Sequence, residues 1–586
     1  MEKDLIEQKR IIINALVNSG INITPQSLRS ILDLKNPQKN LSNLIKELSF
    51  IPNFNSHLTE SILKKISNEE LQKVLKRSIE KSRNLQIEKR STVNHKKLKK
   101  HESSNLEIKT QKSKVQMDEI SAELHPKLED IKVNSTESFF TKEKLKIQQF
   151  GSTKSNIKVS PIAKDYEFDY AILKDPTGKL YTNGEYSDFY QLTLDKFKKL
   201  HTLMRKRPEV LSAVSIKNIL RLSRDVEIST IGLVKNIRQT KNGNYFLELE
   251  DLTGRINVLV RKDSEDQESI KIVKRIVFDQ MLYVKGMYNS GENFKNGIIF
   301  ADYISKIDIP TDYQPNRSTI PISIALISDT HIGSKEFEES LFKRFLNFLN
   351  GKVGNKKLRE IAGRIKYIII NGDLVDGIGV YPNQQNDLII SDIYKQFRIA
   401  SELLAEIPDY IKIFYISGNH EPVRNALPRP AVPKKYSGVL IDLNVTCLGN
   451  PSLLKTHNVN TLIYHGESIH DMNLLIHDLD INKPIDAMKE FLICRHLAPI
   501  YGEKTQIAPA EKDFLVIDKI PDIFHTGHVH INGSGKYNNV TLINSGCFQA
   551  QTDFMKSFGI DPTPGIVPII ELDTLKAFEL DLKSNN

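Results

Sequence analysis

Five short clusters of metal-binding side chains lie in the C-terminal half of this 586-residue sequence. Each cluster directly follows an apolar run with the length of a β-strand. Polar residues at the carboxyl ends of strands converge on one crevice in α/β domains, so the clusters predict a single site. The clusters are D-T-H at 329–331, G-D-L-V-D at 372–376, G-N-H-E at 418–421, Y-H-G at 464–466 and G-H-V-H at 527–530.

The residue types in these clusters predict metal-ion chemistry. Two residues separated by one along a strand point to the same side, so a D-x-H or H-x-H pair can reach one crevice together. Mixed carboxylate, amide and imidazole donors favour Mn²⁺, Zn²⁺ or Fe²⁺ over Mg²⁺, which prefers oxygen ligands. Any one cluster would also fit a turn, a helix cap or a hydrogen-bonded histidine. Their combination after five strands predicts a metal site.

The sequence around the clusters predicts an α/β domain over residues 311–586. Short apolar runs alternate with helix-like stretches at 339–350 and 394–407, which is typical of helices packed over a sheet. The predicted strands are at 322–328, 367–370, 412–417, 461–465 and 540–545.

Two further folded regions are predicted before this domain. Five β-branched runs between 226 and 310, separated by turn clusters, predict a small closed barrel of the oligonucleotide-binding (OB) type. With a preceding helical and strand segment, this region extends over 161–310. We expect the barrel either to bind single-stranded nucleic acid or to act as a docking site for another protein. Residues 1–78 predict a small helical domain, with helix-capping signals at 24–25 and 67–70.

Residues 79–160 predict a disordered basic linker between these regions. From Lys76 to Lys114 the chain has thirteen lysines and arginines against four glutamates. A segment so polar cannot bury enough apolar surface to fold by itself. It would act as a tether or contact nucleic-acid phosphates without sequence preference. The remainder of the chain is close to neutral, which argues against a purely electrostatic DNA clamp.

The composition predicts a cytoplasmic protein. No run approaches the roughly 20 apolar residues of a membrane span, and the charged start of the chain lacks an apolar signal segment. Three isolated cysteines, Cys447, Cys494 and Cys547, form no C-x-x-C pair, which argues against a disulfide framework or a thiolate zinc finger. We therefore expect a reducing compartment and no membrane contact.

The five clusters together resemble the ordered blocks D-x-H, G-D-x-x-D, G-N-H-[DE], H and G-H-x-H of the calcineurin-like metallophosphoesterase superfamily. The resemblance covers about residues 320–575. It implies an α/β sandwich that holds two divalent cations, of which Mn²⁺ is expected and Zn²⁺, Fe²⁺ or Mg²⁺ are alternatives. It implies that His420 protonates the leaving oxygen and that Asp376 orients His420. The implied ligands are Asp329, His331 and His530 for one ion, Asn419, His465 and His528 for the other, and Asp373 between the two.

Longer strings resemble the small subunits of archaeal family D DNA polymerases, over about residues 160–575. They include GNHEPVRNALPRPA, PDIFHTGHVHINGSGKYNNV, INSGCFQAQTDFMKSFGIDPTPG and, in the predicted barrel, NGNYFLELEDLTG. The resemblance implies a proofreading 3′-to-5′ exonuclease that hydrolyses DNA phosphodiesters with a hydroxide held between two metals. A separate large catalytic subunit would be its partner. The alternatives are a noncatalytic scaffold subunit and an independent metal-dependent repair nuclease.

Some residues of these strings have less specific interpretations. Arg424 and Arg429 are predicted to hold a phosphate through their guanidinium groups, with a surface or subunit contact as the alternative. Glu467 stands where the family commonly has a basic residue, and we expect it to weaken phosphate contacts. Tyr381 would either stack on a terminal base or pack within its loop. Before these strings, the S-F-F run at 138–140 loosely resembles a peptide that binds the sliding clamp.

Overall fold

The computed structural model describes residues 160–583, apart from 224, 265 and 291–296, together with a few short pieces nearer the N-terminus. The predicted helical domain at 1–78, the linker at 79–160 and the clamp-binding run at 138–140 therefore lie almost entirely outside the described residues. Over the described part of the chain, no helix is both long and apolar enough to cross a bilayer.

Three of the short N-terminal pieces are strands. β1 (Asn22–Ile23) and β2 (His57–Leu58) pair in parallel with each other. β3 (Lys144–Lys146) lies inside the predicted disordered linker, yet it pairs in parallel with β20 (Ala577–Asp581). The prediction of disorder is therefore wrong for these three residues, because a strand edge far along the chain supplies their hydrogen-bond partners.

Two β-sheets form the C-terminal α/β domain, as the alternation of strands and helices predicts. The first sheet contains β10 (Ser323–Ile327), β11 (Ile365–Asn371), β12 (Lys412–Ile416), β13 (Thr446–Leu448), β19 (Ile566–Glu571), β20 and β3, in the order β13-β12-β11-β10-β19-β20-β3. The second sheet contains β4 (Tyr170–Lys174), β14 (Ser452–Thr456), β15 (Val459–Ile463), β16 (Ile523–Thr526), β17 (Gly533–Tyr537) and β18 (Val540–Asn544), in the order β17-β18-β16-β15-β14-β4.

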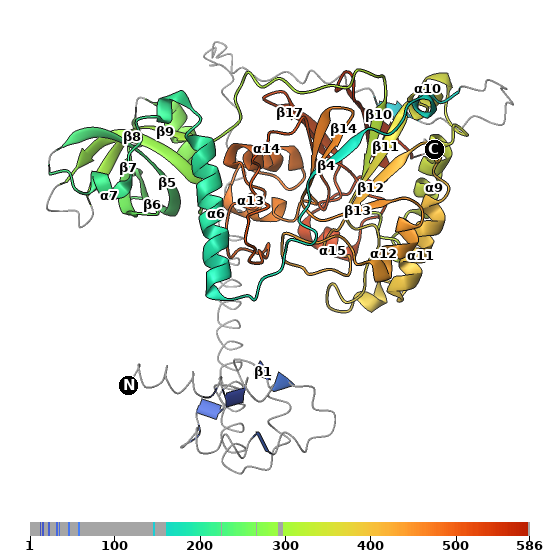
Figure 1. The fold of residues 1–586 in the computed structure, drawn as a ribbon, viewed down its shortest axis with the longest axis horizontal. Helices are drawn as coiled ribbons and strands as arrows, with labels where there is room; N and C mark the ends of the chain where they lie inside the picture. The colour runs from blue at the N-terminus through green and yellow to red at the C-terminus, as the bar shows by residue number, and fades with distance from the viewer. Residues whose placement is uncertain are drawn as a thin grey trace, which may run out of the picture. The chain divides into compact units, whose positions relative to one another are not determined.

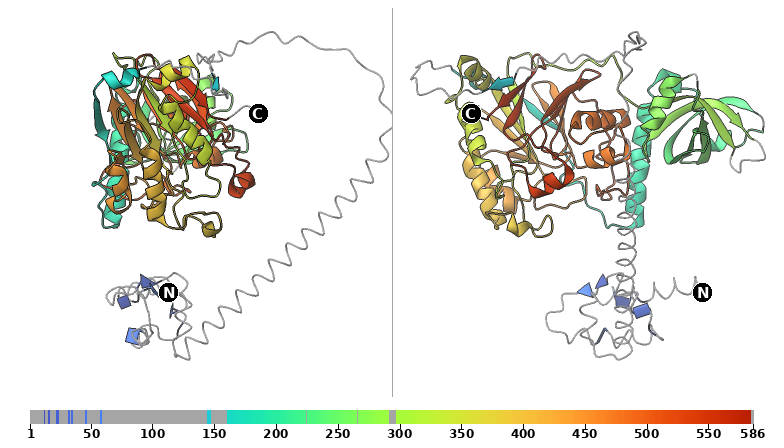
Figure 2. Two further views of the ribbon diagram at one scale, coloured as in Figure 1. Left: turned by 90° about the vertical axis from the view of Figure 1, so that its right-hand side faces the viewer. Right: turned by 180° about the vertical axis from the view of Figure 1, so that it is seen from behind.

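The strands of the first sheet are apolar because both of their faces are buried. In β11, Ile368 and Ile370 pack under helices, whereas Tyr367 and Ile369 pack in a core shared with strands of the second sheet. Figure 1 shows helices over the outer side of the first sheet, and Figure 2 shows two of them, α9 and α11, from behind. The helices of the first sheet are α9 (Glu339–Leu349), α10 (Lys356–Ala362), α11 (Ile393–Leu404) and α12 (Lys434–Ile441). Those of the second sheet include α13 (Ile469–Leu475) and α14 (Pro484–Cys494).

Five strands close into a barrel in the region where the sequence predicts one. Their inward side chains, such as Leu247, Val258 and Ile299, form a separate apolar core. Helix α8 (Gln267–Lys274) connects the third strand to the fourth, and α7 (Ile216–Ile219) packs beside the third. The strands are β5 (Val226–Gln239), β6 (Tyr245–Asp251), β7 (Gly254–Val260), β8 (Met281–Asn289) and β9 (Ile298–Lys306), in the order β5-β6-β7-β9-β8.

The segment before the barrel divides its contacts between the barrel and the α/β domain. Strand β4 lies within the predicted 161–310 region, but it pairs antiparallel with β14 and extends the second sheet. Helix α6 (Tyr186–Met204) contacts β5 and β8 of the barrel, and Lys196 on it donates a hydrogen bond from Nζ to the carbonyl oxygen of Pro499. The first residues of the predicted barrel region therefore belong structurally to the α/β domain.

Candidate metal centre

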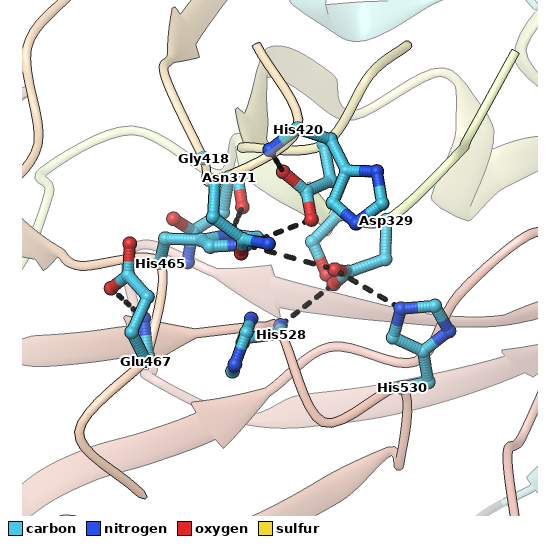
Figure 3. Close-up of polar contacts among 12 residues, drawn as sticks. Asp329, Asn371, Gly418, His420, His465, Glu467, His528 and His530 are labelled. Atoms are coloured by element: carbon cyan, nitrogen blue, oxygen red, sulfur yellow. Dashed lines mark hydrogen bonds and ion pairs between the residues drawn. The ribbon is translucent and has the colours of Figure 1, made fainter. Parts of the chain in front are cut away.

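The five predicted clusters lie together where strands of the two sheets end. Those at 329–331, 372–376 and 418–421 follow β10, β11 and β12, which are parallel neighbours in the first sheet. The other two clusters follow β15 and β16, which are parallel neighbours in the second sheet. Figure 3 shows Asp329, His420, His465, His528 and His530 gathered around one centre. The strand ends therefore bring the five clusters close together, as the sequence predicts.

Five of the predicted ligands have a left-handed backbone conformation, which is unusual outside glycine. Such a conformation costs about 1–3 kcal/mol for a residue with a side chain, and it concentrates at functional sites, although Asp and His tolerate it better than most. Main-chain hydrogen bonds between the strand ends hold this conformation, including Asp329 N to Gly372 O at 3.1 Å. The φ angles are 53° at Asp329, 54° at His331, 50° at Asp373, 70° at His528 and 62° at His530.

Two glycines let these strand ends approach one another. A Cβ atom at Gly372, where φ is 80°, would lie 2.4 Å from Nδ1 of His465. A Cβ atom at Gly418 would lie 2.2 Å from Oδ1 of Asp373. Real Cβ atoms do not make such contacts, so only glycine fits at either position.

The first group of potential ligands comprises Asp329, His331 and His530. Their ligand atoms lie within 4.8 Å of one another, and all three residues are buried. Nε2 of His331 is 3.1 Å from Nε2 of His530, and Nε2 of His530 is 3.5 Å from Oδ1 of Asp329. This is the set that the resemblance to the phosphoesterases implies for one cation.

The second group comprises Asp373, His465 and His528, again with ligand atoms within 4.8 Å. Asn419 joins it, because its Oδ1 is 3.1 Å from Nε2 of His465. Oδ2 of Asp373 lies 3.2 Å from Nε2 of His465 and 3.9 Å from Nε2 of His331 in the first group. Asp373 therefore stands between the two groups, as the resemblance implies for a carboxylate shared by two ions.

The chemistry of the donors fits divalent cations. Among the described residues, the buried Oδ1 of Asp329 has no hydrogen-bond partner. Burial, reinforced by Asp373, raises the pKa of Asp329 to about 6, so a nearby cation would stabilise its ionised form. Burial also holds the pKa of His528 and His530 well below the usual value, which keeps both imidazoles neutral and able to bind a metal.

Asp376 and His420 contact each other differently from the prediction. Nδ1 of His420 lies 2.6 Å from the main-chain oxygen of Asp376, whereas the Asp376 carboxylate is 3.9 Å away. That carboxylate instead lies 2.8 Å from Nδ1 of His331 and accepts a hydrogen bond from Nε2 of Gln384 at 2.9 Å. The main-chain oxygen of Asp376, rather than its carboxylate, therefore makes the direct contact with His420, and an orienting role of the carboxylate toward His420 stays a prediction. The carboxylate contacts the potential ligand His331 directly.

This arrangement predicts the effect of Asp376→Asn. A carboxylate hydrogen-bonded to a ligand histidine fixes its tautomer and raises its basicity, and its loss typically weakens metal binding about 10–100-fold. We expect Mn²⁺ affinity to fall by that factor in titration calorimetry, with the His420 contact intact because it uses the main chain. Unchanged Mn²⁺ affinity together with a slower leaving-group step would instead support an orienting role toward His420.

Sequence reasoning missed the residues that hold the ligands in place. The buried Glu421 accepts hydrogen bonds from the main-chain nitrogens of Asp373, Leu374 and Gly418 at 3.1, 2.8 and 2.7 Å, and from the Tyr415 hydroxyl at 2.7 Å. A glutamate at this position therefore ties the second cluster to the third. The signal was available, since Glu421 lies inside a recognised cluster, but its partners become visible only in the fold.

The main-chain oxygen of Asn371 has a similar role toward His465. It lies 2.7 Å from Nδ1 of His465, which leaves Nε2 to face Asp373.

A second missed residue is His470 in α13, whose ring centroid is 5.2 Å from that of His528. Sequence offered only its spacing from His465 as a signal, and that spacing has no meaning before the position of α13 is known.

Arg429 and Glu467 form a buried ion pair at the edge of the site. Their exposed side-chain fractions are only 4% and 9%, so neither faces solvent. Arg429 also donates hydrogen bonds to the main-chain oxygens of Arg424 and Asn425, at 3.2 and 2.7 Å. Two sequence expectations are therefore corrected. Arg429 has no free face for a phosphate, and Arg429 compensates the charge that Glu467 brings to the site.

Arg424 is half-buried, and its Nε and Nη2 both donate to the carbonyl oxygen of Pro428, at 3.0 and 2.6 Å. Its phosphate contact stays a prediction. Tyr381 is 38% exposed, with its ring centroid 6.3 Å from that of His420. It therefore lies beside the site rather than packed away from it.

Known proteins that resemble this chain agree with one another in family and in name. The family model of the calcineurin-like phosphoesterases matches residues 322–532. A DNA polymerase II small subunit of Methanothermobacter thermautotrophicus is 40% identical over 419 residues, which cover 71% of this chain and 84% of the relative. Proteins of the same name from Pyrococcus horikoshii and Methanocaldococcus jannaschii are each 39% identical. The match covers 72% of this chain and 68% of the first, and 71% of this chain and 69% of the second.

Proposed function

The chain belongs to the family of archaeal DNA polymerase II small subunits, which are the small subunits of the family D polymerases. On this premise, we propose that the chain is a 3′-to-5′ exonuclease. It would remove nucleotides from DNA 3′-ends beside a large catalytic subunit. The observation that carries the proposal is the full set of N and O donors at the ends of five strands, in two groups that share Asp373. A subunit serving only as a scaffold would not need these strained, buried donors.

The proposed reaction is hydrolysis of the last phosphodiester bond. A water oxygen attacks the phosphorus, the bond from phosphorus to the 3′-oxygen breaks, and the terminal nucleotide leaves as a 5′-monophosphate. When bound, two divalent cations lower the pKa of water and neutralise phosphate charge. Asp329, His331 and His530 would hold one ion, and Asn419, His465 and His528 the other, with Asp373 shared.

His420 is the proposed proton donor to the leaving 3′-oxygen. The main-chain oxygen of Asp376 can only accept a hydrogen bond, so Nδ1 of His420 carries hydrogen and Nε2 is the nitrogen that exchanges the proton. The main-chain nitrogen of His420 donates to Oδ1 of Asp373 at 2.9 Å, which fixes the loop beside the shared carboxylate. An alkoxide leaving group needs this proton, because it is a strong base.

His420→Ala should slow hydrolysis of DNA about 100-fold by removing this acid. The effect on a p-nitrophenyl phosphodiester should be small, because p-nitrophenolate leaves without a proton. Bound Mn²⁺, measured by mass spectrometry of the dialysed protein, should stay unchanged. Equal losses on both substrates, together with loss of Mn²⁺, would identify His420 as a ligand instead.

The barrel is proposed to be of the OB type. Its strand order, the parallel pairing of β7 with β9, and α8 between β7 and β8 support this assignment. It contacts the α/β domain through charged groups, since Nζ of Lys306 is 3.1 Å from Oε2 of Glu490 in α14. We therefore propose that the barrel and the α/β domain together form the polymerase small subunit that the resemblance over residues 160–575 implies.

A direct assay tests the proposed function. The full chain, with and without its large subunit, is supplied with Mn²⁺ and 5′-labelled DNA that has either a paired or a mismatched 3′-end. The proposal expects stepwise shortening from the 3′-end and release of 5′-mononucleotides, faster at the mismatch. A chain that binds the large subunit and Mn²⁺ but shortens neither DNA would be a noncatalytic scaffold. Equal cleavage of small phosphodiesters and DNA by a chain that binds no large subunit would point to an independent repair nuclease.

A further inference from the structure

An exposed aromatic ring lies beside the proposed proton donor. The ring centroid of Tyr381 is 6.3 Å from that of His420, with 61° between the ring planes. Tyr381 is 38% exposed, and Ile378 in the same loop is 47% exposed. A partly exposed aromatic ring next to a phosphodiester site can stack on a nucleic acid base.

The loop that carries Tyr381 is held firmly against the segment of His420. A Cβ atom at Gly377 would lie 2.1 Å from the main-chain oxygen of His420, which shows how closely the two backbones approach. Gln396 donates to the carbonyl oxygen of Gly377 at 3.1 Å and accepts from its nitrogen at 3.0 Å. Gln384 accepts a hydrogen bond from the nitrogen of Val380 at 2.9 Å. The ring is therefore presented from a fixed position.

The side of the scissile bond that Tyr381 faces follows from the reaction chemistry. His420 protonates the 3′-oxygen that leaves, and in a 3′-to-5′ exonuclease this oxygen belongs to the penultimate nucleotide, which stays on the DNA. A ring beside His420 is thus on the side of the retained strand. The departing nucleotide is attached to phosphorus and lies on the opposite side of the breaking bond.

From this geometry we infer that Tyr381 is a positioning residue that stacks on the penultimate base and so sets the 3′-oxygen against His420. The inference rests on the proposed exonuclease function and adds the nucleotide that the site recognises. The Tyr381 hydroxyl is already used, since it donates to Oδ2 of Asp387 at 3.1 Å. The ring face, rather than the hydroxyl, is therefore the group that binds.

The test combines variants of Tyr381 with substrates that lack one base. Tyr381→Ala should raise the KM for single-stranded DNA roughly 10- to 100-fold, the range expected for one lost stacking contact. An abasic penultimate nucleotide should raise the KM of the wild type by a similar factor, and Tyr381→Ala should then add no further change. With an abasic terminal nucleotide the full effect of Tyr381→Ala should persist. Tyr381→Phe should resemble the wild type within about threefold, because it keeps the ring.

Tyr190→Ala on α6 is the matched control, since that tyrosine is 51% exposed and α6 contacts the barrel. It should change no KM value. If Tyr381→Ala lowered activity equally on all substrates, including the abasic ones, the residue would be structural and the inference overturned. A wild type that releases mononucleotides while Tyr381→Ala matches it also overturns the inference and leaves the exonuclease proposal intact. A wild type that releases none overturns both.

Discussion

Asp373→Asn is expected to abolish the release of mononucleotides, with a loss of more than about 10³-fold. Asp373 is the carboxylate between the two ligand groups, so its neutral replacement weakens both groups at once. Burial alone would raise the pKa of Asp373, yet His465 and His420 hold it well below the usual value. The residue is therefore an anion in a buried site, which is the form that a pair of cations requires.

Two measurements check this prediction together. Mn²⁺ content should fall in the dialysed Asp373→Asn protein, and the exonuclease assay should show no shortening of DNA. Asp442→Asn, an exposed residue at the end of α12, is the matched control and should keep both properties. An Asp373→Asn protein that retained two Mn²⁺ ions and near-normal activity would contradict the shared-carboxylate arrangement.

Arg429→Ala is expected to destabilise the α/β domain rather than to weaken DNA binding. It would leave the carboxylate of Glu467 buried without its cation, and removing one partner of a buried ion pair typically costs about 3–5 kcal/mol. Asn450 Nδ2 donates to Glu467 at 3.2 Å, but a single neutral donor does not replace the charge. The free energy of unfolding, measured in denaturant, should fall by that amount.

A second variant separates stability from phosphate binding. Arg429→Ala combined with Glu467→Gln should be more stable than Arg429→Ala alone, because it no longer buries an unpaired carboxylate. Arg424→Ala is the control, since it loses hydrogen bonds to one carbonyl oxygen and should cost only about 1 kcal/mol. If Arg429→Ala raised the KM for DNA without any loss of stability, the original prediction of a phosphate contact would be right after all.

Secondary structure in the α/β domain was largely predictable, for a local reason. Strands such as β10 and β11 are continuous apolar runs, and α9 and α11 have apolar residues at helical spacing, so their type is written into short stretches of sequence. The barrel strands were predictable from the same alternation. Strand β4 was not assigned to its sheet, because a short exposed strand gives no indication of which edge it will join.

The sequence by itself determined the donor set of this protein. Five clusters of Asp, Asn and His after strand ends predict metal-ion chemistry, because strand ends in α/β domains converge whatever the residues between them. The resemblance to the phosphoesterase family implied which donors belong together, as in the group of Asp329, His331 and His530.

Only the tertiary structure decided which groups hold those donors in place. Asp376 contacts His331 with its side chain and His420 with its main chain, and no spacing in the sequence distinguishes these two contacts. Arg429 meets Glu467 across 38 positions of the chain. Such pairings depend on side-chain directions and burial, which are set when separate strands and loops pack together, and not by the local order of residues.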